Sequence, residues 1–139
     1  MRRTATDTVF VAEQSVVWQR PSRQAWPHVK RQVAALPPGL ADSLAARAAE
    51  ALSTRHWPLP AAVRWVSALE SDQVQARGLG GSAVYGLSRV AFTLDSLHAL
   101  VYVERRCGAM CGHGAAIWLS RLPDSHVWTQ RGEVWAWSS

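Results

Sequence analysis

The hydrophobic positions in the first third of the chain recur at helical spacing. Pro27 suits the first turn of a helix, and the run Pro37-Pro38-Gly39 ends one. The apolar side chains near and between these limits fall on one face, at Trp26, Val29, Val33 and Leu36. A second helix is predicted from Asp42 or Ser43, either of which can cap it, to about Arg55.

From residue 62 onward the hydrophobic period changes to two, which is typical of strands. We expect strands over 63–67, 85–93, 98–104, 115–121 and 127–137, the last divided at Gly132 by a tight hairpin or a bulge. The stretch 70–81 carries two acids, two glutamines and three glycines, which favours an irregular connection. Thr8–Ala12 is rich in β-branched and aromatic residues and predicts one more strand, with a helix capped by Asp7 as the alternative.

Two helices followed by a run of short strands favour an α+β fold. We expect an antiparallel sheet of four to six strands, built mostly from residues 63–137, with the two N-terminal helices packed on one face. A chain of 139 residues, 48% hydrophobic and 18% charged, belongs to the globular class and fits a single domain over 1–139. The eight tryptophans supply most of the aromatic bulk, and those of the C-terminal strands are expected to pack on the sheet.

No apolar run approaches the ~20 residues that a membrane-spanning helix needs. The start, MRRTATDT, is basic but is not followed by the apolar region of a signal peptide. We therefore expect either a cytoplasmic protein or a mature exported form whose signal has been trimmed. The sequence leaves the oligomeric state open.

Positive charge is concentrated at the N-terminal end of the chain. The net charge is +5, and residues 1–36 account for +4 of it. A basic surface of this kind can meet nucleic acid or another acidic partner. Trp26 with Lys30 and Arg31 is the candidate contact there, because a ring beside cations can stack on bases.

The sharpest local motif is the loop that contains both cysteines, Cys107-Gly-Ala-Met-Cys111-Gly-His113-Gly. One reading is a disulfide that closes a turn between two strands. The second is a metal site formed by Cys107, Cys111 and His113 with a distant fourth ligand. The third is a pair of reduced cysteines, with Arg105 and Arg106 favouring the thiolate of Cys107 and His113 as the only local base.

The C-terminal half resembles a group of small uncharacterised bacterial proteins. The residues that carry the resemblance are Leu87-Ser-Arg-Val-Ala-Phe92, Ala99-Leu-Val-Tyr-Val103, the Cys107-Gly-x-x-Cys111-Gly-x-Gly loop and a tryptophan near the end, Trp137. About 50 residues take part, and Ala91 stands where that group has glycine. The resemblance implies a bacterial source and often an envelope or exported setting. It implies no activity and no catalytic residues.

These patterns favour a non-enzymatic binding or interaction protein, in the manner of an immunity protein or an inhibitor, with another protein as its partner and no cofactor. The candidate contacts are Arg105, Arg106, Trp26, Lys30 and Arg31. Two alternatives stay open: nucleic-acid binding through the basic N-terminal third, and a thiol- or metal-dependent enzyme centred on Cys107, Cys111 and His113.

Overall fold

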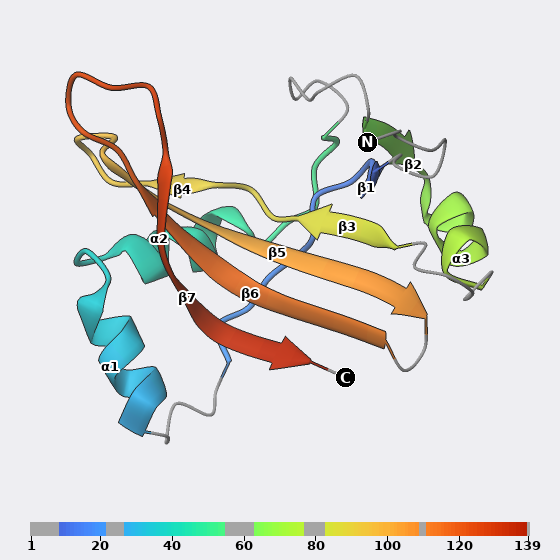
Figure 1. The fold of residues 1–139 in the computed structure, drawn as a ribbon, viewed down its shortest axis with the longest axis horizontal. Coiled ribbons are helices and arrows are strands. Elements are labelled where there is room, and N and C mark those ends of the chain that lie inside the picture. The colour runs from blue at the N-terminus through green and yellow to red at the C-terminus, as the bar shows by residue number, and fades with distance from the viewer. Residues whose placement is uncertain (1–8, 22–26, 55–62, 77–82, 109–110, 139) are drawn as a thin grey trace, which may run out of the picture.

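The chain forms one mixed sheet with short helices against it, in a computed structural model that describes residues 9–21, 27–54, 63–76, 83–108 and 111–138 (Figure 1). The strands are β1 (Val9–Ala12), β2 (Val63–Val66), β3 (Val84–Leu87), β4 (Ala91–Phe92), β5 (His98–Gly108), β6 (Cys111–Ser120) and β7 (Thr129–Ser138). The helices are α1 (Pro27–Ala35), α2 (Leu40–Arg47) and α3 (Ala68–Ala76).

The strands lie in the order β2-β1-β3-β5-β6-β7, and β4 pairs with β5 beyond the end of β3. β1 runs parallel to both of its neighbours, β2 and β3. β3, β5, β6 and β7 are antiparallel to one another in turn. One half of the sheet is therefore parallel and built from short strands, whereas the other half consists of three long antiparallel strands.

The main core lies between α1, α2 and the antiparallel half of the sheet. Leu40 and Leu44 of α2 are almost fully buried, and they pack with Leu100 and Tyr102 of β5. Trp18 belongs to the same cluster, with its ring 5.3 Å from that of Trp135. A second, smaller core joins α3 to the parallel half and consists of Val66, Val74 and Val84.

The expected antiparallel α+β fold is wrong in two respects. The sheet is mixed, because β1 joins it through parallel pairs, and within the described residues it has seven strands rather than four to six. The physical reason is that β1 finds its partners more than fifty residues later in the chain. Local hydrophobic period marks a strand but carries no information on the direction of such a distant neighbour.

The second predicted helix ends early. α2 begins at Leu40 and stops at Arg47, after which residues 52–54 run antiparallel beside residues 13–15. The backbone N–H of Ser15 donates to the carbonyl of Leu52, and that of Thr54 donates to the carbonyl of Glu13. These hydrogen bonds form an isolated antiparallel bridge just past β1, and the alanine-rich sequence alone did not predict it.

The stretch predicted as an irregular connection contains α3. Its N-terminus is a capping box, in which the Ser67 hydroxyl accepts from the Glu70 N–H and the Glu70 carboxylate accepts from the Ser67 N–H. A serine followed three residues later by glutamate is a readable signal for this helix. The helix has little amphipathic pattern, because Val74 is its one buried residue among those described.

A buried serine connects β3 to β4. Ser88 has no exposed surface, and its hydroxyl accepts the backbone N–H of Tyr102 at 2.9 Å while donating to the carbonyl of Arg89 at 3.0 Å. The Ser88 N–H in turn donates to the carbonyl of Tyr102. A side chain thus replaces a backbone carbonyl in the ladder, and β4 continues along β5 after a break.

Candidate functional site

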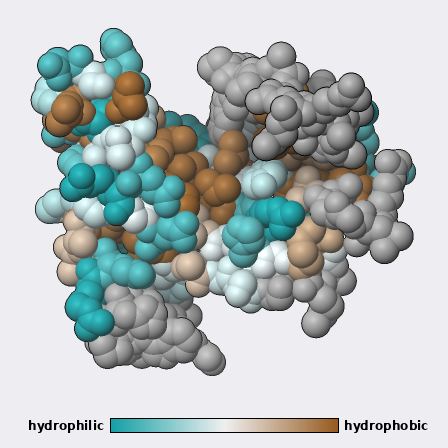
Figure 2. Space-filling model, in the orientation of Figure 1, coloured by the Kyte–Doolittle hydropathy of each residue, from teal (hydrophilic) through white to brown (hydrophobic). Residues whose placement is uncertain are grey.

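The face of the antiparallel half that α1 and α2 leave open carries a hollow. Alternation places Leu100 and Tyr102 of β5 toward the helices, so that Val103 and Arg105 face the other way. The hollow has a volume of about 390 Å³. Its apolar floor is formed by Val103, Ala115, Ile117 and Ala136. Figure 2 shows hydrophobic surface in the middle of this face, between hydrophilic residues.

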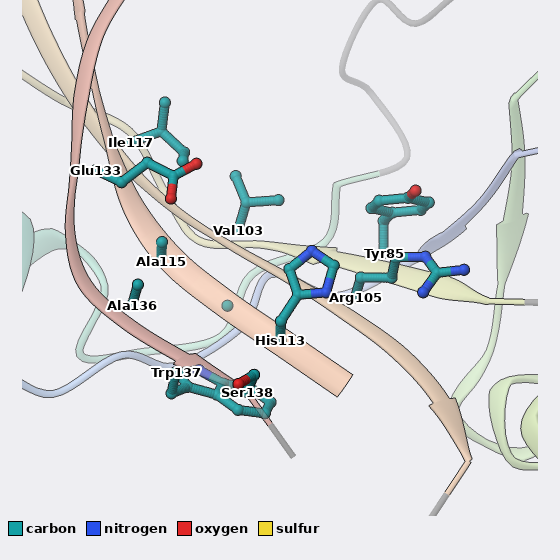
Figure 3. Close-up of a pocket in the computed structure, with 11 residues that line it drawn as sticks. Tyr85, Val103, Arg105, His113, Ala115, Ile117, Glu133, Ala136, Trp137 and Ser138 are labelled. Carbon is teal, nitrogen blue, oxygen red and sulfur yellow. The ribbon is translucent and has the colours of Figure 1, made fainter. Parts of the chain in front are cut away.

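Four polar side chains form a row across one end of the hollow. Strand register pairs Tyr85 of β3 with Arg105 of β5, Arg105 with His113 of β6, and His113 with Ser138 of β7. All four line the hollow, and each can donate a hydrogen bond. Adjacent strands are ~4.8 Å apart, so the row extends roughly 14 Å across the strands. Figure 3 shows His113, Arg105 and Tyr85 side by side at this end.

The opposite end of the hollow carries an acid. Glu133 of β7 is exposed and pairs with Ile117 of β6, which lies four residues from His113 along that strand. At ~3.3 Å per strand residue, about 13 Å therefore separates the donor row from the acid. In Figure 3, Glu133 and Ile117 lie together at one end, and Val103 and Ala115 lie between that pair and His113. The hollow is thus polarised along the strands.

The two neighbouring arginines predicted as contacts lie on opposite faces of β5. Arg106 faces the helix side, where its guanidinium donates to Glu104 at 3.1 Å and lies 5.3 Å from the centre of the Trp137 ring. The hydrogen bond to Glu104 raises the pKa of Arg106. Arg105 is half-buried in the wall of the hollow, and its guanidinium makes a long contact, 3.5 Å, with the Cys107 sulfur. Arg105 therefore has the more available guanidinium.

A hydrogen-bonded network on the helix side fixes the end of β7. The Trp137 indole N–H donates to the Tyr102 hydroxyl at 2.7 Å, and that hydroxyl donates to Glu104 at 3.0 Å. Burial raises the pKa of Tyr102 to about 12. The network crosses β6 above Gly114, and only the missing side chain at Gly114 leaves room for it. It positions the part of β7 that forms one wall of the hollow.

Cys107 and Cys111 lie at disulfide-bonding distance, with their Cα atoms 5.1 Å apart. They join the ends of β5 and β6, as the first of the three readings expected. Sulfurs paired in this way can serve neither as metal ligands nor as a nucleophile. Within the described parts of the chain no three potential ligands gather at one point. His113 lies in the donor row, beside Arg105 rather than over the sulfurs.

The basic N-terminal candidates are only partly described. Trp26 and the Lys30 side chain lie outside the described residues, whereas Arg31 is exposed on α1. Arg20 is engaged elsewhere, since it forms a 2.7 Å ion pair with Asp42 and lies 6.0 Å from the Trp135 ring. Nothing in the described chain joins these residues into one surface with the hollow.

A second surface feature is an apolar tip formed by the β4–β5 turn and the β6–β7 loop. The Arg121 side chain ties these loops together by donating to the carbonyls of Ser96 and Ser125. The exposed apolar side chains of the tip are Phe92, Leu94, Leu122 and Val127. Both loops stand together at the upper left of Figure 1. Among the described residues, α1, α2 and α3 all lack the length and apolar character that a membrane-spanning helix requires.

Sequence reasoning named Arg105 and His113 but missed Tyr85, Glu133 and Ser138. Period-two alternation could assign each residue to a face of its own strand. Only the order of the strands shows that Tyr85 and Ser138, 53 positions apart in the sequence, belong to one row. Comparison of the chain with protein-family models, with curated proteins and with solved structures finds no match.

Proposed function

We propose that this chain is a non-enzymatic binding protein that receives its partner in the hollow on the open face of the sheet. The observation that carries the proposal is the composition of that surface. An apolar floor provides the area from which a ligand displaces water, and a few polar side chains at its edges orient that ligand. The volume of about 390 Å³ falls at the lower end of the range typical of ligand sites.

The rigidity of the surroundings supports the same proposal. β5, β6 and β7 are each ten or eleven residues long, and the cysteine pair joins two of them at the donor end. The network of Tyr102 and Trp137 holds the third strand. A preformed surface loses little conformational entropy when a ligand binds, which favours recognition.

The test is a screen of small molecules and short peptides against the intact, isotope-labelled protein, with backbone amide shifts as the readout. We expect hits to perturb the amides of residues 103–105, 113–117 and 133–138. The variant Ala136→Trp introduces an indole at an exposed position of the floor and should abolish those perturbations.

Leu69→Trp is the matched control, because it adds an indole at an exposed position of α3 away from the hollow. It should leave binding unchanged. Hits that map to the apolar tip, or binding that survives in Ala136→Trp, would show that the hollow is not the site.

A further inference from the structure

The polarity of the hollow specifies a class of ligand. From it we infer that the hollow binds short apolar peptides with free termini, with the terminal carboxylate at the donor row and the terminal ammonium at Glu133. The inference rests on the function proposed above and narrows it from an unspecified partner to a zwitterion with an apolar body.

The donor row suits a carboxylate because it combines a guanidinium with further hydrogen-bond donors. Arg105 presents a guanidinium, which matches the geometry of a carboxylate better than any other side chain. His113 lies directly opposite it on β6, and Tyr85 lies opposite it on β3. Among the described residues no carboxylate forms an ion pair with Arg105, whereas its neighbour Arg106 is held by Glu104.

The acid at the other end makes the site selective for a zwitterion. An apolar anion alone, such as a fatty acid, would bring its tail to the Glu133 carboxylate and lose water from it without compensation. A terminal ammonium would pair with that carboxylate. The Glu133 carboxylate accepts a weak hydrogen bond from the Gln130 side-chain amide at 3.5 Å. A ligand cation can replace this donor.

The length of the floor sets the length of the ligand. Roughly 13 Å along the strands corresponds to three or four extended residues at ~3.3 Å each. The floor side chains are small or β-branched, at Val103, Ala115, Ile117 and Ala136. They leave room for apolar side chains of similar size, so that valine and alanine suit the central positions of the ligand.

The experiment measures the dissociation constants of four forms of the tripeptide Val-Ala-Val with the intact protein by amide-shift titration. The forms have free termini, an amidated C-terminus, an acetylated N-terminus, or both caps. With the wild type, we expect each single cap to weaken binding about tenfold, the usual effect of losing one charge-assisted contact.

Variants of the protein assign each terminus to its partner. In Arg105→Gln the free and amidated peptides should bind equally, while the effect of acetylation persists. In Glu133→Gln the free and acetylated peptides should bind equally, while the effect of amidation persists. Arg31→Gln and Asp72→Asn, at exposed positions of α1 and α3, change the net charge equally and should preserve both effects.

Equal binding of all four forms in the hollow would overturn the inference while leaving the proposed function intact. The inference would also be overturned if the effect of amidation persisted in Arg105→Gln, or if the effect of acetylation persisted in Glu133→Gln. If no ligand of any kind perturbs the hollow, both the inference and the proposed function fail.

Discussion

Gly114 is a position at which a single methyl group should damage the sheet. A Cβ there would lie 2.5 Å from the indole nitrogen of Trp137 and 2.6 Å from the hydroxyl oxygen of Tyr102. These two atoms are the partners of the 2.7 Å hydrogen bond that fixes the end of β7. Both belong to rigid rings, and Tyr102 is buried in the main core, so neither can step aside alone.

The cost of Gly114→Ala follows from three contributions. Overpacking of a well-filled site costs about 1–3 kcal/mol. Loss of the hydrogen bond between Trp137 and Tyr102 adds ~1 kcal/mol. Replacing a strand glycine by alanine returns about 0.5–1 kcal/mol, because the unfolded chain loses conformational freedom. We therefore expect the free energy of unfolding to fall by roughly 2 kcal/mol.

The measurement is urea unfolding followed by tryptophan fluorescence, with Gly132→Ala as the matched control. Gly132 lies in β7 next to β6, a Cβ at this position would meet no atom within 4 Å, and its φ lies outside the left-handed region. Its substitution should change stability by less than ~0.5 kcal/mol or increase it slightly. If the two variants unfold at the same urea concentration, the argument that Gly114 exists to admit Trp137 is refuted.

Three further predictions concern the same half of the sheet. Ser88→Ala leaves the buried N–H of Tyr102 without its acceptor and should lower the unfolding free energy by about 1–3 kcal/mol; a urea midpoint equal to that of the wild type would contradict this. Replacing Cys107 and Cys111 by serine should cost about 2 kcal/mol, the loop entropy of so short a ring, and a reductant should lower the melting temperature of the wild type only. Because burial raises the pKa of Tyr102 from 10.0 to about 12, the neutral phenol is favoured in the folded state. Its contribution to stability is complete below pH 10 and is lost as the pH rises toward 12, so the unfolding free energy should fall more steeply there in the wild type than in Tyr102→Phe; equal slopes would contradict the shift.

Local features of the chain were predicted well where neighbouring residues decide them. Pro27 and the run after Leu36 bracket α1, which spans Pro27–Ala35. β2 lies close to its predicted range, whereas β5 continues four residues past the predicted end at 104 and β6 begins four residues before the predicted start at 115. The cysteine pair joins β5 to β6 at disulfide distance. Gly132 marks a bulge, one of the two alternatives, since the register of β7 shifts between Trp118 and Leu119 of β6.

The C-terminal tryptophans show where strand alternation is insufficient. Alternation puts Trp135 and Trp137 on one face and Val134 on the other. In the structure Val134 and Trp135 are both buried in the main core, while Trp137 bonds to Tyr102 on the same side. A bulge in β7, with a φ of 55° at Trp135, turns both side chains to the same face. The bulge depends on the packing of Trp18 and β6 against Trp135 rather than on the local sequence.

The sequence by itself determined the local elements: a hairpin of β5 and β6, the position of the cysteine pair between these strands, and the first helix. Each follows from turn chemistry or from the period of adjacent residues. Only the tertiary structure decided the parallel entry of β1, the face that α1 and α2 cover, and the row of Tyr85, Arg105, His113 and Ser138. Strand order and sheet coverage arise from contacts between distant segments, and it is those contacts that leave the polarised hollow uncovered by the helices.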